Sequence, residues 1–179
     1  MGTVVAIETA AGAVLAADQR ALRGGTVTEG AKRVFDLDGA GAAAVGDQGD
    51  VDEFGRRLES EVRSDRTERD REVDVDRLAR MAAEVASATG VDAVVAAHDD
   101  DGVVRIRQVD DEGAVLEGPF VALGSGAPIA TGRLEGADRD QALDVAEDLA
   151  RETLETVAER DPETGEEITV WSLASEDAE

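Results

Sequence analysis

The first residues of the chain pose a chemical question. In MGTVVAIET, Gly2 and Thr3 stand directly before the β-branched run 4–7. A threonine that becomes the N-terminal residue of a chain can act as a nucleophile, with its own α-amino group as the general base. The same residues are also typical of a plain edge strand. These two interpretations give opposite answers about catalysis, so the other residues have to decide between them.

Carboxylates and hydroxyl groups stand at the ends of several apolar runs. Asp18 ends LAAD, Ser125 lies in GSGAP, and Asp161 and Thr164 lie in ERDPETG. Taken alone, each of these residues is typical of a turn or a helix cap. Gly46, in AVGD, is by itself a turn glycine that tolerates unusual backbone angles. Their chemistry therefore depends on whether the fold brings them together.

The basic residues that could serve a site are adjacent in the sequence. Lys32 is the only lysine of the chain, and Arg33 follows it. Lysine can exchange a proton near neutral pH when its surroundings lower its pKa, whereas arginine remains charged. Because side chains alternate along a strand, only one of the two residues is expected to face a given site.

Several kinds of site are excluded by what the sequence lacks. There is no cysteine, so disulfides, zinc–thiolate sites and thiol catalysis are ruled out. His98 is the only histidine, and we interpret it as a turn residue. The run of aspartates after it lacks the spaced acids of a calcium loop, and GSGAPI does not complete a dinucleotide-binding motif. We therefore expect no cofactor and no metal.

The charge of the chain is strongly acidic. Asp and Glu outnumber Lys and Arg 42 to 18, which gives a formal net charge of −24, and the acids are spread along the whole chain. Molar salt screens such self-repulsion by shortening the Debye length to ~3 Å. We therefore expect a cytoplasmic protein of a halophile.

The sequence has no basic patch that could bind nucleic acid. It also has no apolar run of the ~18 residues that a membrane span needs.

The elements that must position the candidate residues can be read from periodicity. Runs that we predict as strands occupy 3–8, 13–18, 33–38, 42–47, 91–98, 103–109 and 168–173, with a further short run ending at Phe120. The first four form two antiparallel hairpins, and turns at Gly102 and Gly113 join the later ones.

Helical spacing appears between and after these strands. The apolar residues of 51–62 fall on one face of a predicted helix that Asp50 caps. A nearly all-charged stretch, 63–74, separates this helix from a second one that ends at Gly90, and a third covers 141–159.

Hairpins on both sides of a helical pair predict two antiparallel sheets packed face to face, with helices on the outer faces. This is a four-layer αββα sandwich of the α+β class, although periodicity alone also permits other α+β layouts. We predict one domain over 1–174 and a frayed acidic tail over 175–179.

Five segments of the chain resemble the β subunits of the 20S proteasome, in the same order and at similar spacing. They are AVLAADQR (13–20), KRVFDLD (32–38), AVGDQGD (44–50), VALGSGAP (121–128) and AERDPETGE (158–166). The resemblance spans essentially the full chain. It implies an N-terminal-nucleophile hydrolase fold, assembly into rings, and a peptide substrate if the protein is active.

The resemblance also implies roles for particular residues. Asp18 matches the acid of the family's site, and Gly46 matches the glycine whose amide stabilises the oxyanion. Ser125 and Asp161 match a supporting serine and aspartate, and Thr164 takes the place of a second serine.

Two central positions depart from the family pattern. The family's catalytic lysine falls on Arg33, and using Lys32 instead requires a register shift of one residue. Counted back from Asp18 without a gap, the nucleophile position falls on Gly2, and Thr3 matches the family's second residue. Thr3 could take the nucleophile's role only if the first strand slipped by one residue and Met1 and Gly2 were removed with no propeptide to guide the cut.

We therefore predict a divergent proteasome β-type homologue that has kept the scaffold and lost threonine-peptidase activity. It would act as a structural or regulatory subunit, with other proteasome subunits or as a self-assembled ring. The alternative is an active threonine endopeptidase that uses Thr3. A small acidic binding module unrelated to proteolysis is a third interpretation, which requires the resemblance to be superficial.

Overall fold

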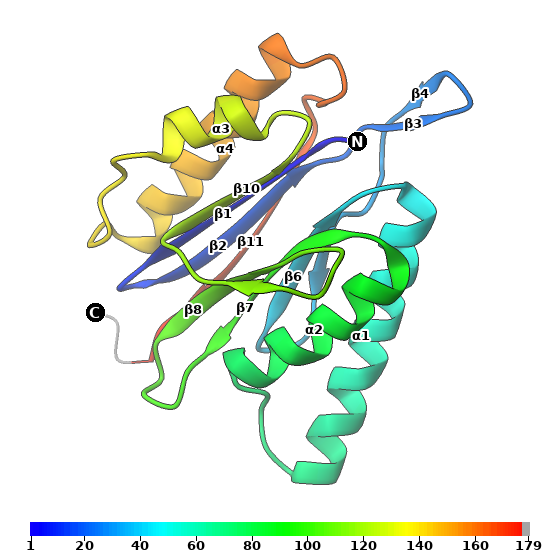
Figure 1. The fold of residues 1–179 in the computed structure, drawn as a ribbon. Coiled ribbons are helices and arrows are strands. Elements are labelled where there is room, and N and C mark those ends of the chain that lie inside the picture. Colours follow the sequence, from blue (N-terminus) through cyan, green and yellow to red (C-terminus); the bar gives the residue numbers. More distant parts are fainter. Residues whose placement is uncertain (177–179) are drawn as a thin grey trace.

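Two antiparallel sheets form the centre of the computed structural model, which describes residues 1–176 (Figure 1). The first sheet has the strand order β10-β1-β2-β11, formed by Phe120–Gly124, Thr3–Thr9, Gly12–Asp18 and Ile168–Ala174. The second has the order β5-β6-β7-β8-β9, formed by Val34–Asp36, Gly41–Val45, Asp92–His98, Val104–Val109 and Val115–Leu116. A separate short hairpin consists of β3 (Ala21–Arg23) and β4 (Thr26–Thr28).

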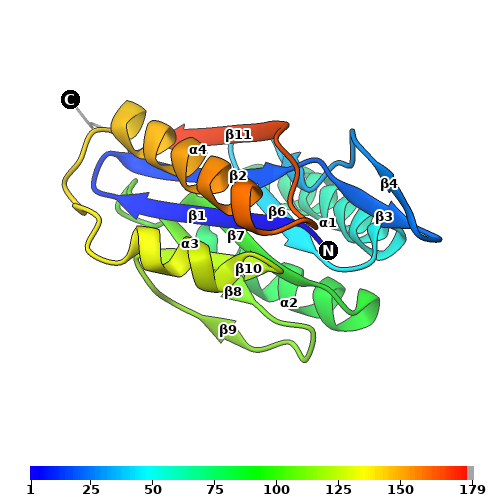
Figure 2. The ribbon, with the colours of Figure 1, turned by 90° about the horizontal axis from the view of Figure 1, so that it is seen from above.

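Helices cover the outer faces of both sheets (Figures 1 and 2). α1 (Gln48–Arg69) and α2 (Val75–Thr89) pack on the second sheet, and α3 (Ala127–Leu134) and α4 (Leu143–Arg160) pack on the first. The layers therefore follow the order helix, sheet, sheet, helix. This confirms the predicted αββα sandwich.

Apolar side chains fill the space between the two sheets. Val4, Ala6 and Leu15 of the first sheet meet Val94 and Ile106 of the second. Because side chains alternate along a strand, the residues between them point to the opposite face of the sheet.

That opposite face of the first sheet is also buried. Val5 and Ile7 of β1 pack with Leu134 of α3 and with Leu154 and Val157 of α4. A strand that is buried on both faces has apolar residues in an unbroken run. This explains the sequence TVVAI in β1 and the sequence AVLAA in β2.

Helix α1 is longer than the apolar spacing predicted. It continues to Arg69 through the charged stretch, where Glu59 pairs with Arg63 and Asp65 pairs with Arg69, four residues apart in each case. Asp65 is buried and also bonds Arg77 of α2. Ion pairs hold this half of the helix in place. Because charged residues form them, the sequence shows no apolar residues at helical spacing here.

The start of α1 also differs from the prediction. Asp47 occupies the N-cap position, without a side-chain cap hydrogen bond, and Asp50 lies inside the first turn. Asp50 is therefore not the cap, although an acidic residue in the first turn still favours the helix through its dipole.

Three features were not predicted: α3, the β3–β4 hairpin and most of β10, since the predicted short run ends at Phe120, where β10 begins. α3 is only eight residues long and buries just Ala130 and Leu134, so it carries almost no apolar period. The β3–β4 hairpin surrounds a Gly24-Gly25 turn that we interpreted as a loop.

The chain end is described as far as Glu176. Ser175 is buried and its hydroxyl accepts a hydrogen bond from the Val104 N–H at 3.0 Å, while the Glu176 N–H donates to the Gly102 carbonyl at 2.8 Å. The rest of the predicted tail, 177–179, lies outside the described residues. Among residues 1–176, no helix has both the length and the apolar composition that crossing a bilayer requires.

Candidate functional site

The candidate residues gather at one end of the first sheet. Thr3, at the start of β1, pairs with Gly124 at the end of β10, and Val4 pairs with Ala17 near the end of β2. The antiparallel register thus places the beginning of β1 next to the ends of its two neighbours. The loop that follows α4 closes over the same end, because the Gly165 N–H donates to the last residue of β2.

Asp18 is fully buried and both of its carboxylate oxygens are occupied. Oδ1 accepts hydrogen bonds from the Thr3 N–H at 2.9 Å and from Arg33 Nη1 at 3.2 Å. Oδ2 accepts from the N–H groups of Gly165 at 2.8 Å and Arg20 at 3.1 Å. A single carboxylate therefore joins four separate points of the chain.

Arg33 enters the site from the segment before β5, with only 3% of the residue exposed. Its Nη1 also donates to the Asp18 carbonyl at 2.9 Å, and its Nη2 donates to the Arg20 carbonyl. Burial lowers the pKa of the Arg33 guanidinium, and the Asp18 carboxylate opposes that effect. An arginine nevertheless stays protonated in proteins, so Arg33 is a fixed cation here.

Gly2 lies against this ion pair. Its φ of +79° falls in the left-handed region that favours glycine. A Cβ on Gly2 would lie 2.7 Å from Arg33 Nη2 and 2.7 Å from Asp18 Oδ1, closer than real side-chain carbons approach. The Arg33 guanidinium therefore fills the space that a side chain at position 2 needs.

Thr3 points to the other side of the sheet. Like Val5, it faces the helix layer and is fully buried. Its Oγ1 accepts a hydrogen bond from the Gly126 N–H at 3.0 Å and lies 2.8 Å from the Thr164 Oγ1. The hydroxyl of Thr3 is thus enclosed and bonded, and the ion pair of Asp18 with Arg33 contacts only its backbone N–H.

A chain of hydroxyl groups ends on Asp161. Its Oδ2 accepts from the hydroxyls of Ser125 and Thr164, both at 2.6 Å. Because the Thr164 proton is used in this way, the Thr3 hydroxyl donates to Thr164. Burial alone would raise the pKa of Asp161, but these two hydroxyls and the Glu163 N–H hold it below the ordinary value.

An open cavity of about 250 Å³ adjoins Arg33. It is lined by Met1, Ala21, Leu22, Arg33, Gly46, Asp47, Gln48 and Glu163. The structure thus brings Gly46 and Arg33, two of the candidate site residues, to one cavity. Asp18, Ser125, Asp161 and Thr164 form the hydrogen-bonded layer beside it.

Lys32 is the predicted site residue that the structure does not bring into this cluster. Its Nζ lies 5.3 Å from the centre of the Phe35 ring, and its carbonyl accepts a hydrogen bond from the Gln48 side chain at 2.9 Å. Since neighbouring residues on an extended segment point in opposite directions, Arg33 enters the site and Lys32 does not.

Sequence reasoning missed several residues of the site. Arg20 donates from Nη1 to the Pro162 carbonyl at 3.0 Å and so fixes the loop after α4. Gly126 supplies the amide that bonds Thr3. Gln48 and Glu163 line the cavity from the start of α1 and from that loop. All four act through tertiary contacts that leave no local pattern.

Within residues 1–176, no group of three or more His, Asp or Glu side chains is arranged to hold a metal ion. Most polar atoms of the site bond one another and the backbone, whereas the buried Arg33 Nε and Gln48 Oε1 have no hydrogen-bond partner among the described residues. The arrangement thus supplies oriented hydrogen-bond donors and one fixed cation beside a cavity, with no exposed hydroxyl at its centre.

Comparison with known proteins agrees with the fold. A family model of proteasome subunits matches residues 1–173. Proteasome subunit beta 2 of Haloarcula marismortui is 30% identical, over 99% of this chain and 80% of its own length. Proteasome subunit beta of Halorhabdus utahensis is 29% identical (99% and 78%), and proteasome subunit beta 1 of Ignicoccus hospitalis is 32% identical (94% and 88%).

The first two of these relatives come from halophiles, in agreement with the adaptation to salt that the composition predicted. The family match covers nearly the whole chain, and each of the three relatives is a β subunit. The chain therefore belongs to the proteasome subunit family, as a β-type member.

Proposed function

We propose that this β-type protein is non-catalytic and contributes structure or regulation to a ring assembly linked to protein degradation. One observation carries the proposal. The ion pair of Asp18 with Arg33 lies directly against Gly2, and Gly2 has no side chain that could act as a nucleophile. Membership of the family removes the alternative of an unrelated acidic binding module.

The chemistry of acyl transfer supports this conclusion. A covalent nucleophile needs a hydroxyl or thiol within hydrogen-bond reach of a base. Gly2 offers no such group, and Arg33 cannot accept a proton at physiological pH. Asp18 holds the site together, since each of its carboxylate oxygens accepts two hydrogen bonds.

The alternative nucleophile, Thr3, would have to leave its present surroundings. Moving it to the place of Gly2 slips β1 by one residue and exchanges the faces of Val4 and Val5, both fully buried. It also breaks the bonds of the Thr3 hydroxyl to Thr164 and the Gly126 amide. These costs favour the non-catalytic proposal.

The test is peptidase activity of the full chain in molar potassium chloride. Fluorogenic peptides with acidic, basic and apolar residues before the cut should show no turnover. An epoxyketone probe followed by intact mass measurement should show no adduct. An adduct on an N-terminal Thr3, kept in Thr3→Ser and lost in Thr3→Ala, would establish the threonine endopeptidase instead.

Ring assembly is supported by two exposed apolar pairs on different surfaces. Leu22 and Val27, which face each other across the β3–β4 hairpin, are 55% and 53% exposed. Val115 and Leu116 of β9, at the open edge of the second sheet, are 43% and 51% exposed. Burial of these side chains against a neighbouring subunit would remove their apolar surface from water.

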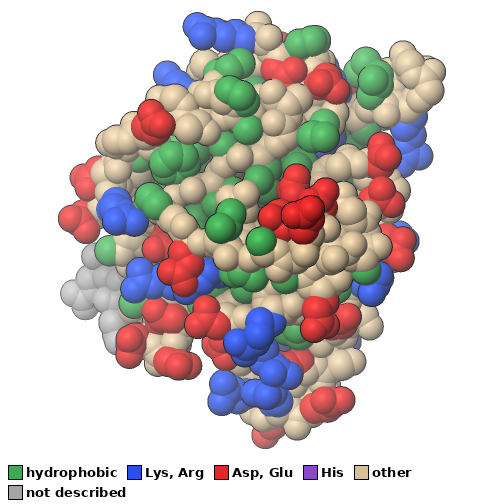
Figure 3. Space-filling model, in the orientation of Figure 1, with side chains coloured by type: hydrophobic (Ala, Val, Ile, Leu, Met, Phe, Trp, Pro, Cys, Tyr) green, Lys and Arg blue, Asp and Glu red, His purple; other side chains and the backbone are tan. Residues whose placement is uncertain are grey.

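The hairpin projects from the body of the molecule (Figures 1 and 3). An isolated two-stranded hairpin is marginally stable in water, so a partner that covers it would stabilise it. Two unlike patches favour a head-to-tail contact, which closes into a ring when the rotation between copies allows it. The partner is a second copy or another proteasome subunit.

Sedimentation in molar potassium chloride tests this part. The purified chain, alone or with proteasome subunits of its host, should sediment as a ring-sized species. Leu22→Asp should reduce it to monomers, whereas Thr26→Asp, which adds the same charge to the hairpin, should not. A stable monomer under all of these conditions contradicts ring assembly.

We further propose that residues 1–174 act as one β-type domain and that the protein works in the cytoplasm of a halophile. The family match over 1–173 and the acidic composition support these two statements.

A further inference from the structure

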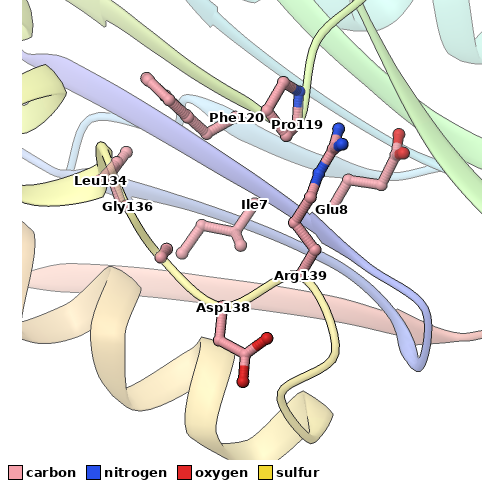
Figure 4. Close-up of a pocket in the computed structure, with 9 residues that line it drawn as sticks. Ile7, Glu8, Pro119, Phe120, Leu134, Gly136, Asp138 and Arg139 are labelled. Atoms are coloured by element: carbon pink, nitrogen blue, oxygen red, sulfur yellow. The ribbon is translucent and has the colours of Figure 1, made fainter.

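Two adjoining hollows lie at the end of β1 that is remote from Gly2 and Thr3. The first has a volume of about 230 Å³, and its apolar lining includes Ile7, Phe120 and Leu134 (Figure 4). The second, of about 330 Å³, is lined by Glu8, Arg105, Arg107, Glu117, Gly118 and Arg139. Since Glu8 and Arg139 border both hollows, the two form one cleft, which we call the β1-end cleft.

The first hollow offers an apolar surface. Ile7 and Leu134 belong to the core between the first sheet and its helices, and Phe120 packs against the same core. In Figure 4 the Ile7 side chain is drawn below Phe120 and to the left of Arg139, and the Asp138 carboxylate points away from the other labelled side chains. Asp138 instead accepts a hydrogen bond from the Asp140 N–H at 2.9 Å.

The second hollow gathers three arginines in a molecule whose net charge is strongly negative. Arg105 pairs with Glu8 at 3.3 Å, and Arg107 pairs with Glu117 at 3.4 Å. Each of these two arginines also pairs with a second carboxylate. Three guanidinium groups thus line this hollow beside two carboxylates, although the whole chain carries a formal charge of −24.

Arg139 differs from the other two arginines. It is exposed, and its side chain makes no ion pair or hydrogen bond with any other residue of the described range 1–176. Figure 4 shows it extending along the first hollow toward Glu8. Within the described range, the Arg139 guanidinium therefore has no side-chain partner, and it lies at the edge that the apolar and the charged hollows share.

We propose that the β1-end cleft binds an amphiphilic monoanion, a carboxylate that carries a short apolar group. The apolar group would lie against Ile7, Phe120 and Leu134, and the carboxylate would accept hydrogen bonds from the Arg139 guanidinium. A mainly apolar hollow with a few oriented polar groups is the usual form of a small-ligand site. Charge-assisted bonds from the planar guanidinium fork to a carboxylate are among the stronger ones in proteins. The carboxylate can come from a small organic acid or from an apolar C-terminal residue of a polypeptide.

Calorimetric titration of the full chain in molar potassium chloride tests the site. The probes are 4-methylpentanoate, its neutral amide and acetate. The first should bind with saturation, the amide should bind at least tenfold more weakly because it lacks the charge, and acetate should bind more weakly because it lacks the apolar group. Arg139→Gln should weaken 4-methylpentanoate about tenfold.

Arg133→Gln is the matched control, since Arg133 is an exposed arginine of α3 that does not line the cleft. It should leave the affinity unchanged.

A second arm compares a short peptide ending in leucine, as the free acid, with its C-terminal amide. Tighter binding of the free-acid peptide than of 4-methylpentanoate assigns the ligand to a polypeptide end, and binding of the small acid alone assigns it to an organic acid. Absence of binding, or binding that neither the amide nor Arg139→Gln weakens, overturns the proposal.

Discussion

At the scale of single residues, Gly2 and Arg33 occupy one space. The positive φ of Gly2 disfavours most side chains, and the guanidinium of Arg33 would have to move to admit a Cβ. The absence of a side chain at position 2 and the presence of a bulky cation at position 33 therefore form one steric arrangement. We expect their effects on stability to be coupled, as for other residues in contact.

Substitution of Gly2 tests this coupling. Gly2→Ala should lower the free energy of unfolding by about 1–3 kcal/mol, through backbone strain and the clash with Arg33. The cost should be smaller in an Arg33→Lys background, because the planar guanidinium is gone. Chemical unfolding in molar salt measures both values.

Gly25→Ala is the matched control, because Gly25 has a φ of +81° and no atom near its missing Cβ. It should show the backbone strain alone, independent of position 33. Equal costs for Gly2→Ala in both backgrounds would contradict the steric coupling.

Asp161 gives a prediction about pH. Its pKa is held below the ordinary value of about 4, so its stabilising effect is complete above that pH and is lost as the pH falls through the lowered pKa. Asp161→Asn should therefore reduce stability at neutral pH and flatten the loss of stability on acidification below about pH 4. Urea unfolding across the acid range measures the dependence of stability on pH. Asp111→Asn, at an exposed aspartate, should leave this pH dependence unchanged. An unchanged pH dependence in Asp161→Asn would refute the stabilising role of the Asp161 carboxylate.

At the scale of elements, the second half of α1 depends on ion pairs. The Asp65 carboxylate is 5% exposed and bonds Arg77 of α2 at 2.5 Å and Arg69 at 3.4 Å. It therefore joins the two helices that cover the second sheet.

Asp65→Ala should destabilise the protein by about 1–3 kcal/mol, because it removes charge-assisted bonds from a buried position. Glu59→Ala removes an exposed pair of the same helix, with Arg63, and should cost less than about 0.5 kcal/mol. Thermal unfolding in molar salt compares the two variants. A cost for Asp65→Ala no larger than that of Glu59→Ala would show that the buried pair does not anchor α1.

The elements also show what the sequence could and could not predict. Apolar alternation and helical spacing identified the main strands, α2 and α4, because these elements bury a continuous face. The end of α1 was not predicted because ion pairs hold it. The whole of α3 was not predicted because this helix buries only two residues. In the site, the family resemblance and the count back from Asp18 directed attention to Gly2, which the structure places against Asp18 and Arg33. The filling of its space by Arg33 is a tertiary contact that no local pattern records.

At the scale of the whole molecule, the acidic charge is distributed over the surface, as Figure 3 shows for one face. The formal charge of −24 makes the folded state repel itself in dilute salt. Raising the salt concentration from about 0.1 M to about 1 M shortens the Debye length from ~10 Å to ~3 Å, so most of this repulsion should disappear.

The melting temperature should therefore rise by several degrees over that range of potassium chloride. A variant with exposed acids of α4 neutralised (Glu152→Gln, Glu155→Gln and Glu159→Gln) should melt higher in dilute salt and depend less on salt. Scanning calorimetry of both proteins measures the two slopes. A melting temperature of the native chain that does not depend on salt would contradict self-repulsion as the controlling term.

The contact between Gly2 and Arg33 also has a historical consequence. A lineage that replaced Gly2 by a hydroxyl residue while Arg33 was present would produce a less stable protein that still has arginine in place of a lysine at position 33. A lineage that replaced Arg33 first would loosen the ion pair with Asp18 and gain nothing at position 2. Neither single step is rewarded, so we expect descent by small steps to preserve glycine at position 2 and arginine at position 33 together.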